Sequence, residues 1–274
     1  MNLSKKLIIS IFLLITSISL LIYVGFYSYQ NSNNLIDVSK EISIQKSTDE
    51  IVSSSIDKIL EKISFGTYDN YSQLQEVQKV LEAKAESYYQ DSLKYIYYFF
   101  AITAFFILIF YFWDREILTL FIALSAIVSL VFALISPLLM VMMHKDLPLV
   151  GDVTLSFESK TILTTIEKLY HEDNLLLAGV ILLFSILIPL FKSLVILMYG
   201  FLKESGLNKK ATSLIDKMGK WSMADVFIVS VLVVFFSTKQ DIHSSLKIQV
   251  GLYFFLGYVL LSMLGSSMIG KGRE

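Results

Sequence analysis

The chain has 274 residues, of which 55% are hydrophobic and only 17% are charged. Soluble domains carry about 25% charged residues, so this composition excludes an ordinary soluble protein. The formal net charge of −1 gives no electrostatic basis for binding nucleic acid. The absence of cysteine excludes disulfides, thiolate chemistry and cysteine-based zinc sites. The apolar residues gather in blocks of about 20, the length needed to cross a bilayer, which predicts an integral membrane protein.

The hydrophobic pattern predicts an all-α, polytopic membrane helix bundle with about six transmembrane helices and an extracytoplasmic helical hairpin. The first membrane helix occupies residues 1–28 and has two basic residues, Lys5 and Lys6, near its start. Its long apolar core, with no small-residue cleavage site behind it, favours an uncleaved signal anchor over a cleaved signal peptide. Residues 29–93 are polar and carry apolar residues at helical spacing, interrupted by a turn at residues 65–70. We interpret them as two helices forming either a self-packed stalk or a docking surface for a partner.

The rest of the chain is expected to lie mostly within the membrane. The second helix of the hairpin continues into a membrane helix at residues 94–113, and a four-helix membrane module follows at residues 114–270. In that module we predict spans at 117–143, 175–202, 222–236 and 248–268, a loop outside the membrane at 144–173, and a basic linker at 203–220.

Basic residues predict the orientation, because they are enriched in short cytoplasmic segments. One set of span ends carries Lys5, Lys6, Arg115, the lysines of the 203–220 linker, Lys271 and Arg273. The opposite ends carry fewer: Lys145, Lys160, Lys168, Lys239 and Lys247. Both termini are therefore expected in the cytoplasm, with the hairpin and the 144–173 loop on the other side.

Two ionisable residues fall inside predicted spans. Lys192 lies well within the 175–202 span, and Asp225 lies about one turn into the 222–236 span. Such a group near the bilayer centre costs at least about 2.5–3.5 kcal/mol on insertion scales. Both are expected in the cytoplasmic half of the membrane, where an ion pair between them would lower the cost for each.

Polar residues near this pair extend the predicted site. Pro189 frees a backbone carbonyl in mid-span, which is tolerated where the backbone lines a cavity or finds another partner. Ser185, Lys192 and Tyr199 are seven residues apart and share one helix face. The full predicted polar site comprises Ser185, Pro189, Lys192, Ser193, Tyr199, Trp221, Ser222 and Asp225.

Each of these features also has a purely structural interpretation. Ser222 and Asp225 fit a capping box at the start of a span, and Lys192 could extend its amine to the headgroups. Stripes of small and hydroxyl residues are most often helix-packing surfaces. Two such stripes are present, one at Ser125, Ser129 and Ser136 and one at Gly251, Tyr258, Ser262, Gly265 and Ser266.

Enzymatic chemistry is not indicated by any motif. The sequence has no HExxH pattern, no GxSxG pattern and no glycine-rich phosphate loop. Three histidines, His144, His171 and His243, fall in segments outside the predicted spans, with nothing else to suggest a metal site. We therefore expect a protein that is not an enzyme and that has no cofactor and no metal.

The run Gly219-Lys220-Trp221-Ser222-Met223-Ala224-Asp225-Val226-Phe227 closely resembles a signature of the paraquat-inducible protein A family, W-S-M-x-D-V-F at the start of a span. Residues 177–192 and the pair Ser136-Pro137 are also similar to its four-span module, so the resemblance covers about residues 114–270. The positions that match the family are Lys192, Trp221, Ser222 and Asp225. Familiar long members carry two modules and cysteine-rich zinc ribbons, whereas this chain has one module and no cysteine.

This resemblance implies a multi-pass protein of the bacterial inner membrane. It further implies a component of a lipid transport system that works with a periplasmic mammalian-cell-entry (MCE) domain protein to move lipids between the inner membrane and the periplasm or outer membrane. Membrane lipids and that protein are the expected partners, with a homo-oligomer also open and no nucleic acid. The alternative function is a non-transporting scaffold or assembly subunit that recruits partners through its extracytoplasmic hairpin.

Overall fold

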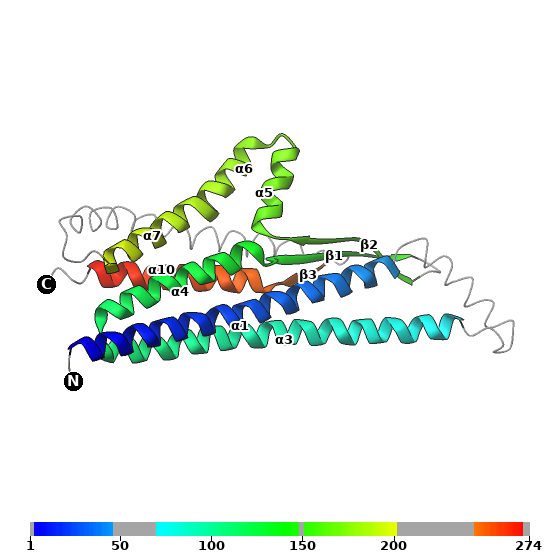
Figure 1. Cartoon of the computed structure of the whole chain (residues 1–274). Coiled ribbons are helices and arrows are strands. Elements are labelled where there is room, and N and C mark those ends of the chain that lie inside the picture. The colour runs from blue at the N-terminus through cyan, green and yellow to red at the C-terminus, as the bar shows by residue number, and fades with distance from the viewer. Residues whose placement is uncertain (1–2, 46–69, 148–150, 202–243, 271–274) are drawn as a thin grey trace.

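The computed structural model describes residues 3–45, 70–147, 151–201 and 244–270. Its helices are α1 (Leu3–Gln45), α3 (Asn70–Trp113), α4 (Arg115–Ile135), α5 (Ile162–His171), α6 (Leu175–Leu182), α7 (Ile188–Phe201) and α10 (Val250–Gly270), with a π-helical turn η1 (Leu183–Leu187) that joins α6 to α7. Three strands, β1 (Leu139–Leu147), β2 (Gly151–Lys160) and β3 (Ser244–Ile248), form a sheet at one end of the bundle (Figure 1).

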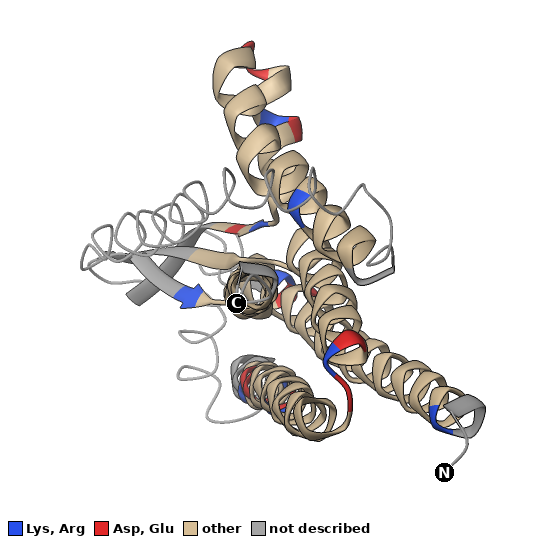
Figure 2. Ribbon diagram, turned by 90° about the vertical axis from the view of Figure 1, so that its left-hand side faces the viewer, with Lys and Arg blue, Asp and Glu red and all other residues tan. Residues whose placement is uncertain are grey.

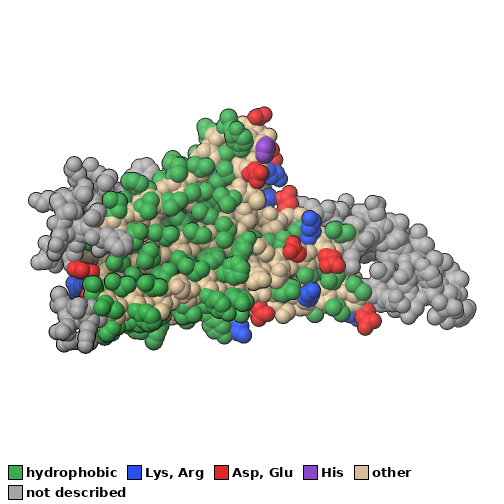
Figure 3. All heavy atoms as spheres, in the orientation of Figure 1, with side chains coloured by type: hydrophobic (Ala, Val, Ile, Leu, Met, Phe, Trp, Pro, Cys, Tyr) green, Lys and Arg blue, Asp and Glu red, His purple; other side chains and the backbone are tan. Residues whose placement is uncertain are grey.

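Five helices in the described ranges are long and apolar enough to cross a membrane: α1, α3, α4, the continuous α6–η1–α7 helix, and α10. Hydrophobic side chains cover the bundle surface, and charged side chains gather around the sheet and the far ends of α1 and α3 (Figure 3). This distribution matches a lipid-facing belt with a water-exposed end. The predicted polytopic helix bundle is confirmed, whereas the predicted 222–236 span lies outside the described residues.

Helices α1 and α3 form a long antiparallel pair (Figure 1). At about 1.5 Å per residue, the 43 residues of α1 extend roughly 65 Å, about twice the thickness of the hydrocarbon core. Their polar halves therefore project well beyond the membrane. There Val38 and Ile42 of α1 pack on Leu81 of α3, which gives this extension a small apolar core of its own.

Serine side chains allow α1 to approach its neighbours closely. Ser28 Oγ donates a hydrogen bond of 2.9 Å to the carbonyl of Ser92, and Trp113 Nε1 donates one of 2.9 Å to Ser10 Oγ. These bonds join the two helices near the two opposite ends of their predicted membrane spans. Lipid tails are as apolar as the helices, so no hydrophobic driving force brings membrane helices together. Small hydroxyl residues at the interface let the helices approach closely and pack.

The ends of α4 are specified by its sequence. Asp114 is the N-cap, and its carboxylate accepts the backbone N–H of Glu116 at 2.9 Å. At the other end Ser136 adopts an extended conformation, as expected of a residue that precedes a proline. Pro137 therefore ends the span at Ile135, which makes the predicted span at 117–143 too long.

The predicted loop at 144–173 is wrong, because it folds into the sheet and α5. Strand β1 begins directly after α4, with Leu139 paired to Lys160 of β2 and to Ile248 of β3, in the order β2-β1-β3. After α5, Asp173 adopts a left-handed conformation with φ of 59°. The N–H of Asn174 then bonds the carbonyl of Leu169, which completes a Schellman turn and redirects the chain into α6.

The bundle core lies among α3, α4 and α10. It is rich in fully buried aromatic rings: Phe99 meets Phe254 edge-on with centroids 5.2 Å apart, and Phe110 lies 5.2 Å from Phe121. The α6–α7 arm leaves the bundle on the side opposite α1 and α3 (Figure 2). Only its α7 part packs extensively on α4, so the arm is attached to the bundle mainly at the end that carries Lys192.

A substitution at Gly251 tests the contact between the end of α4 and the start of α10. A Cβ added at Gly251 would lie 2.7 Å from the carbonyl oxygens of Ser136 and Pro137, which are backbone atoms that cannot rotate away. We expect Gly251→Ala to lower stability by about 1–3 kcal/mol, measured as a reduced thermal unfolding midpoint in detergent. Gly179→Ala is the matched control, since nothing lies within 4 Å of that added Cβ and no loss is expected. Equal stability of the two variants would contradict this close contact.

Candidate functional site

Lys192 is buried inside the membrane bundle, with only 3% of its surface exposed. It lies one turn into α7, and its Nζ donates a hydrogen bond of 3.0 Å to Ser262 Oγ of α10. The Ser262 hydroxyl in turn donates to the carbonyl of Val259 at 3.1 Å. The amine is therefore held by an oriented acceptor, and it does not reach the headgroups as the alternative interpretation required.

A second polar contact lies about one turn along the same helix pair. Tyr258 is fully buried, and its hydroxyl donates a hydrogen bond of 3.2 Å to the carbonyl of Pro189. Tyr258 and Ser262 are four residues apart and so share one face of α10. Two hydrogen bonds from successive turns thus join α10 to the part of α7 that carries the lysine.

The backbone next to this site is irregular for an identifiable reason. Pro189 has no N–H, and in a regular α-helix its ring would clash with the carbonyl of Ser185. The chain forms the π-helical turn η1 there, in which the N–H of Ile188 bonds the carbonyl of Leu183, five residues back. π-Turns inside helices often mark functional sites. The predicted break at Pro189 is thus present as a widened turn rather than as an unwound segment.

The buried lysine lies at the level of the middle of the bundle. A Cβ added at Gly265 of α10 would lie 3.2 Å from Ile196 of α7 and 3.4 Å from Ile122 of α4, so the three helices meet there. Helix α4 runs in the opposite direction to α7 and α10 (Figure 1). One turn from that point towards the sheet, the three helices α4, α7 and α10 therefore carry Ser125, Lys192 and Ser262, respectively. Ser125 is the eleventh of the 21 residues of α4, which puts this layer near mid-membrane.

Two hydroxyls near this layer are buried without a hydrogen-bond partner. Ser193 of α7 and Ser125 of α4 are both fully buried, and neither Oγ has a hydrogen-bond partner among the residues that the structure describes. A buried unpaired hydroxyl costs free energy, so it usually needs an explanation such as a ligand or a water. Ser193 follows Lys192 in α7, and Ser125 shares with Ser129 the face of α4 that meets α10.

The structure brings together part of the predicted site. Lys192, Ser193 and Pro189 lie together on α7, Ser185 is buried in η1, and the half-buried Tyr199 packs two turns further on against the Ala123 cluster. Trp221, Ser222 and Asp225 lie outside the described residues. The partners Tyr258 and Ser262 were not included in the predicted site, although their polar stripe on one helix face was visible in the sequence. In the described part of the chain, no three histidine or acidic side chains gather as a metal site.

The fold and this site define a multi-pass membrane protein with a lysine held inside its helix bundle. Residues 118–271 match the family model of paraquat-inducible protein A. The match covers more than half of the chain, so the chain belongs to that family, and the resemblance seen in the sequence is confirmed. The same comparisons found no match among curated proteins or among solved structures.

The Tyr258 hydroxyl provides a test of the α7–α10 contact. Tyr258→Phe removes a donor from the buried carbonyl of Pro189 and is expected to lower stability by about 0.5–1.5 kcal/mol. Tyr253→Phe is the matched control, because Tyr253 is a half-buried tyrosine of the same helix whose hydroxyl makes no hydrogen bond in the structure. The measurement is thermal unfolding in detergent. A larger loss for Tyr253→Phe than for Tyr258→Phe would refute this role of the hydroxyl.

Proposed function

We propose that this chain is the inner-membrane component of a lipid transport system. In this role it works with a periplasmic MCE-domain protein to move lipids between the inner membrane and the periplasm or outer membrane, and it performs no chemical reaction. Membership of the paraquat-inducible protein A family supports a membrane component of this kind. The observation that carries the proposal is the burial of Lys192 near the middle of a membrane bundle.

A buried lysine is costly, so its presence needs a reason. Ionisable groups inside membranes are rare and mostly mark substrate, ion or proton pathways. An ammonium group has three N–H donors, which suits contact with a lipid phosphate or exchange of a proton with a carboxylate. The widened turn at η1 and the unpaired hydroxyl of Ser193 add further polar groups to the stretch of chain that carries Lys192. This combination favours a working site over a packing contact.

We assign Asp225 as the second ionisable member of the site. This assignment depends on the sequence, since Asp225 matches the family signature and is predicted, like Lys192, in the cytoplasmic half of the membrane. A paired carboxylate would offset much of the cost of burying the amine. Trp221 and Ser222 belong to the same signature and are proposed to shape the site around the pair.

The extension of α1 and α3 supports a partner on the side of the membrane where the sheet lies. Its polar halves project roughly 30 Å beyond the membrane belt and share only a small apolar core. A two-helix extension of this kind is a reasonable contact for an MCE-domain protein or for a second copy of the chain. It is also the observation that favours the second candidate function, a scaffold that recruits partners without moving lipid.

Neutral substitutions at Lys192 and Asp225 separate these two functions. Removing one member of a buried pair leaves the other uncompensated, at a cost of about 3–5 kcal/mol, so Lys192→Ala or Asp225→Ala should lower the protein level. The double variant Lys192→Met/Asp225→Leu should restore the level but remain inactive in lipid transport. Asp225→Asn should accumulate normally and lose activity, because it keeps the shape of the side chain but cannot titrate.

Protein level is measured by immunoblot of membranes, and activity by transfer of labelled phospholipid in a reconstituted system with the partner. Full transport by the double variant would show a purely structural pair and would favour the scaffold function. Full transport by Asp225→Asn alone would remove proton exchange from the proposal.

The proposed orientation places both termini in the cytoplasm. The described part of the structure is compatible with this, because α1 begins and α10 ends at the same end of the bundle (Figure 1). The chain has no cysteine, so each introduced cysteine is a unique label. Cysteines at positions 72 and 156, replacing Ser72 and Ser156, should react with a membrane-impermeant maleimide added to cells, whereas one replacing Ser213 should react only after lysis. The reverse labelling pattern would show that the protein has the opposite orientation.

A further inference from the structure

A pocket of about 630 Å³ lies at the end of the bundle that carries the sheet, away from Lys192. Its walls come from the outer part of α1, the end of β2 and one face of α5. Five charged residues line it, namely Lys40, Lys160, Lys168, Glu158 and Glu172, together with the apolar side chains of Phe157 and Leu169. Three lysines and two glutamates leave the pocket with an excess of one positive charge.

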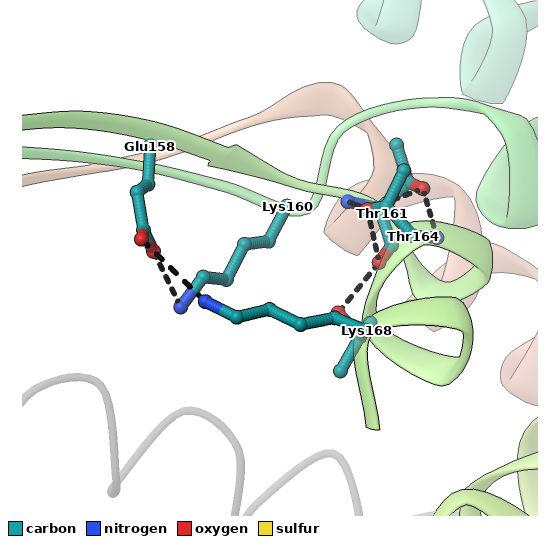
Figure 4. Close-up of polar contacts among 6 residues, drawn as sticks. Glu158, Lys160, Thr161, Thr164 and Lys168 are labelled. Atoms are coloured by element: carbon teal, nitrogen blue, oxygen red, sulfur yellow. Dashed lines mark hydrogen bonds and ion pairs between the residues drawn. The ribbon is translucent and has the colours of Figure 1, made fainter. Parts of the chain in front are cut away.

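The charges in the pocket are partly paired. Glu158 Oε2 lies 2.7 Å from Lys160 Nζ, and its Oε1 lies 3.7 Å from Lys168 Nζ (Figure 4). The hydrogen bond from Lys160 lowers the pKa of Glu158 below its ordinary value, so this carboxylate is ionised at neutral pH. Lys40, on the opposite wall, has no carboxylate within ion-pair distance among the residues that the structure describes. The unbalanced positive charge therefore belongs to the Lys40 side of the pocket.

Helix α5 connects this pocket to the membrane surface. It runs across the direction of α4 and α10 at the level where α4 ends (Figure 1). Its residues Thr164, Thr165 and Lys168 line the pocket, whereas Leu163 and Tyr170 lie on the opposite face of the helix and are 46% and 62% exposed. The exposed Glu167 shares this outer face, and Leu163 and Tyr170 form its apolar part, which can meet the acyl chains at a membrane interface.

The apolar surface continues from α5 into the next helix. Leu175, Leu176 and Leu177 begin α6 three residues after Glu172, and each is more than half exposed. Most of α6 is exposed, although Ile181 packs against the bundle core and Ala178 is buried. A charged pocket and an apolar surface thus adjoin on one short stretch of chain, with α5 near the end of the α4 span and Lys40 of α1 further from the membrane.

We propose that this pocket binds the phosphodiester of a phospholipid headgroup at the membrane face that carries the sheet. A phosphodiester has one negative charge, which matches the single excess positive charge of the lining residues. The lysine amines and the hydroxyls of Thr164 and Thr165 are suitable donors to its oxygens, while Phe157 and Leu169 can contact the glycerol and the first acyl carbons. This binding site is separate from Lys192 and does not depend on lipid transport.

Binding of a soluble short-chain lipid tests the proposal directly. Full-length protein purified in dodecyl maltoside is titrated with dihexanoylphosphatidylglycerol in a calorimeter. We expect saturable binding that is about tenfold weaker in Lys40→Glu, because the reversal replaces an attraction with a repulsion. Lys40→Arg should retain binding. Lys79→Glu is the matched control, since Lys79 is an exposed lysine of the α3 extension that does not line the pocket.

Two further titrations identify the ligand. Inorganic phosphate should bind far more weakly than the lipid, and dihexanoylglycerol, which lacks phosphate, should not compete with it. Phosphate binding as tight as lipid binding would show a site for a free anion and overturn the proposal. Equal competition by dihexanoylglycerol, or unchanged binding in Lys40→Glu with an unchanged thermal midpoint, would overturn it as well. These readouts measure binding alone, so they are independent of any transport assay.

Discussion

The interior of a bilayer offers no water to a polar group, and every polar atom placed there must find its partner within the protein. Lys192 makes this constraint most severe, because its amine is nine-tenths or more buried among membrane helices. Ser262 meets part of the demand from α10, and that contact requires α7 and α10 to lie at a fixed height relative to each other. Tyr258 fixes the same height through the carbonyl of Pro189.

The same constraint explains how serine is used in two different ways in this bundle. Ser129 donates to the carbonyl of Phe254 at 2.7 Å, so its hydroxyl is satisfied and simply joins α4 to α10. Ser125 lies one turn earlier on the same face, and its hydroxyl has no partner. The serines of this stripe look equivalent in the sequence, but in the structure one hydroxyl is hydrogen-bonded and the other is not. Packing accounts for Ser129, whereas Ser125 belongs to the layer of Lys192.

Sequence patterns were sufficient for the membrane class, the family and the place of Lys192 inside a membrane helix, because long apolar blocks and a charge within them are strong signals. The sheet could not be predicted in the same way. Leu139 to Met143 is an apolar run that continues the α4 pattern, and periodicity alone does not separate a short buried strand from a helix. Pro137 was the available signal that the helix ends before that run.

The partners of Lys192 were beyond sequence reasoning for another reason. Helical spacing shows that Tyr258 and Ser262 share a face, but it does not show which neighbouring helix that face meets or at what height. That information depends on close backbone contacts such as the one at Gly251, which fixes the start of α10 against the end of α4. The sequence therefore offered a polar stripe on one helix and a lysine on another, without the contact between them.

One continuous stretch of chain links the charged pocket to the buried lysine. It begins at Lys168 in α5, turns at Asp173, passes along the exposed leucines of α6 and reaches Lys192 just after η1. Both irregular points, the left-handed Asp173 and the π-turn before Pro189, lie at the ends of α6, which packs on α5 and touches the bundle core through Ile181. Contacts at these two ends therefore add to those of Ala178 and Ile181 in fixing the position of α6. Changes at either end, in the Schellman turn or in the Tyr258 hydrogen bond, are expected to act on the same element.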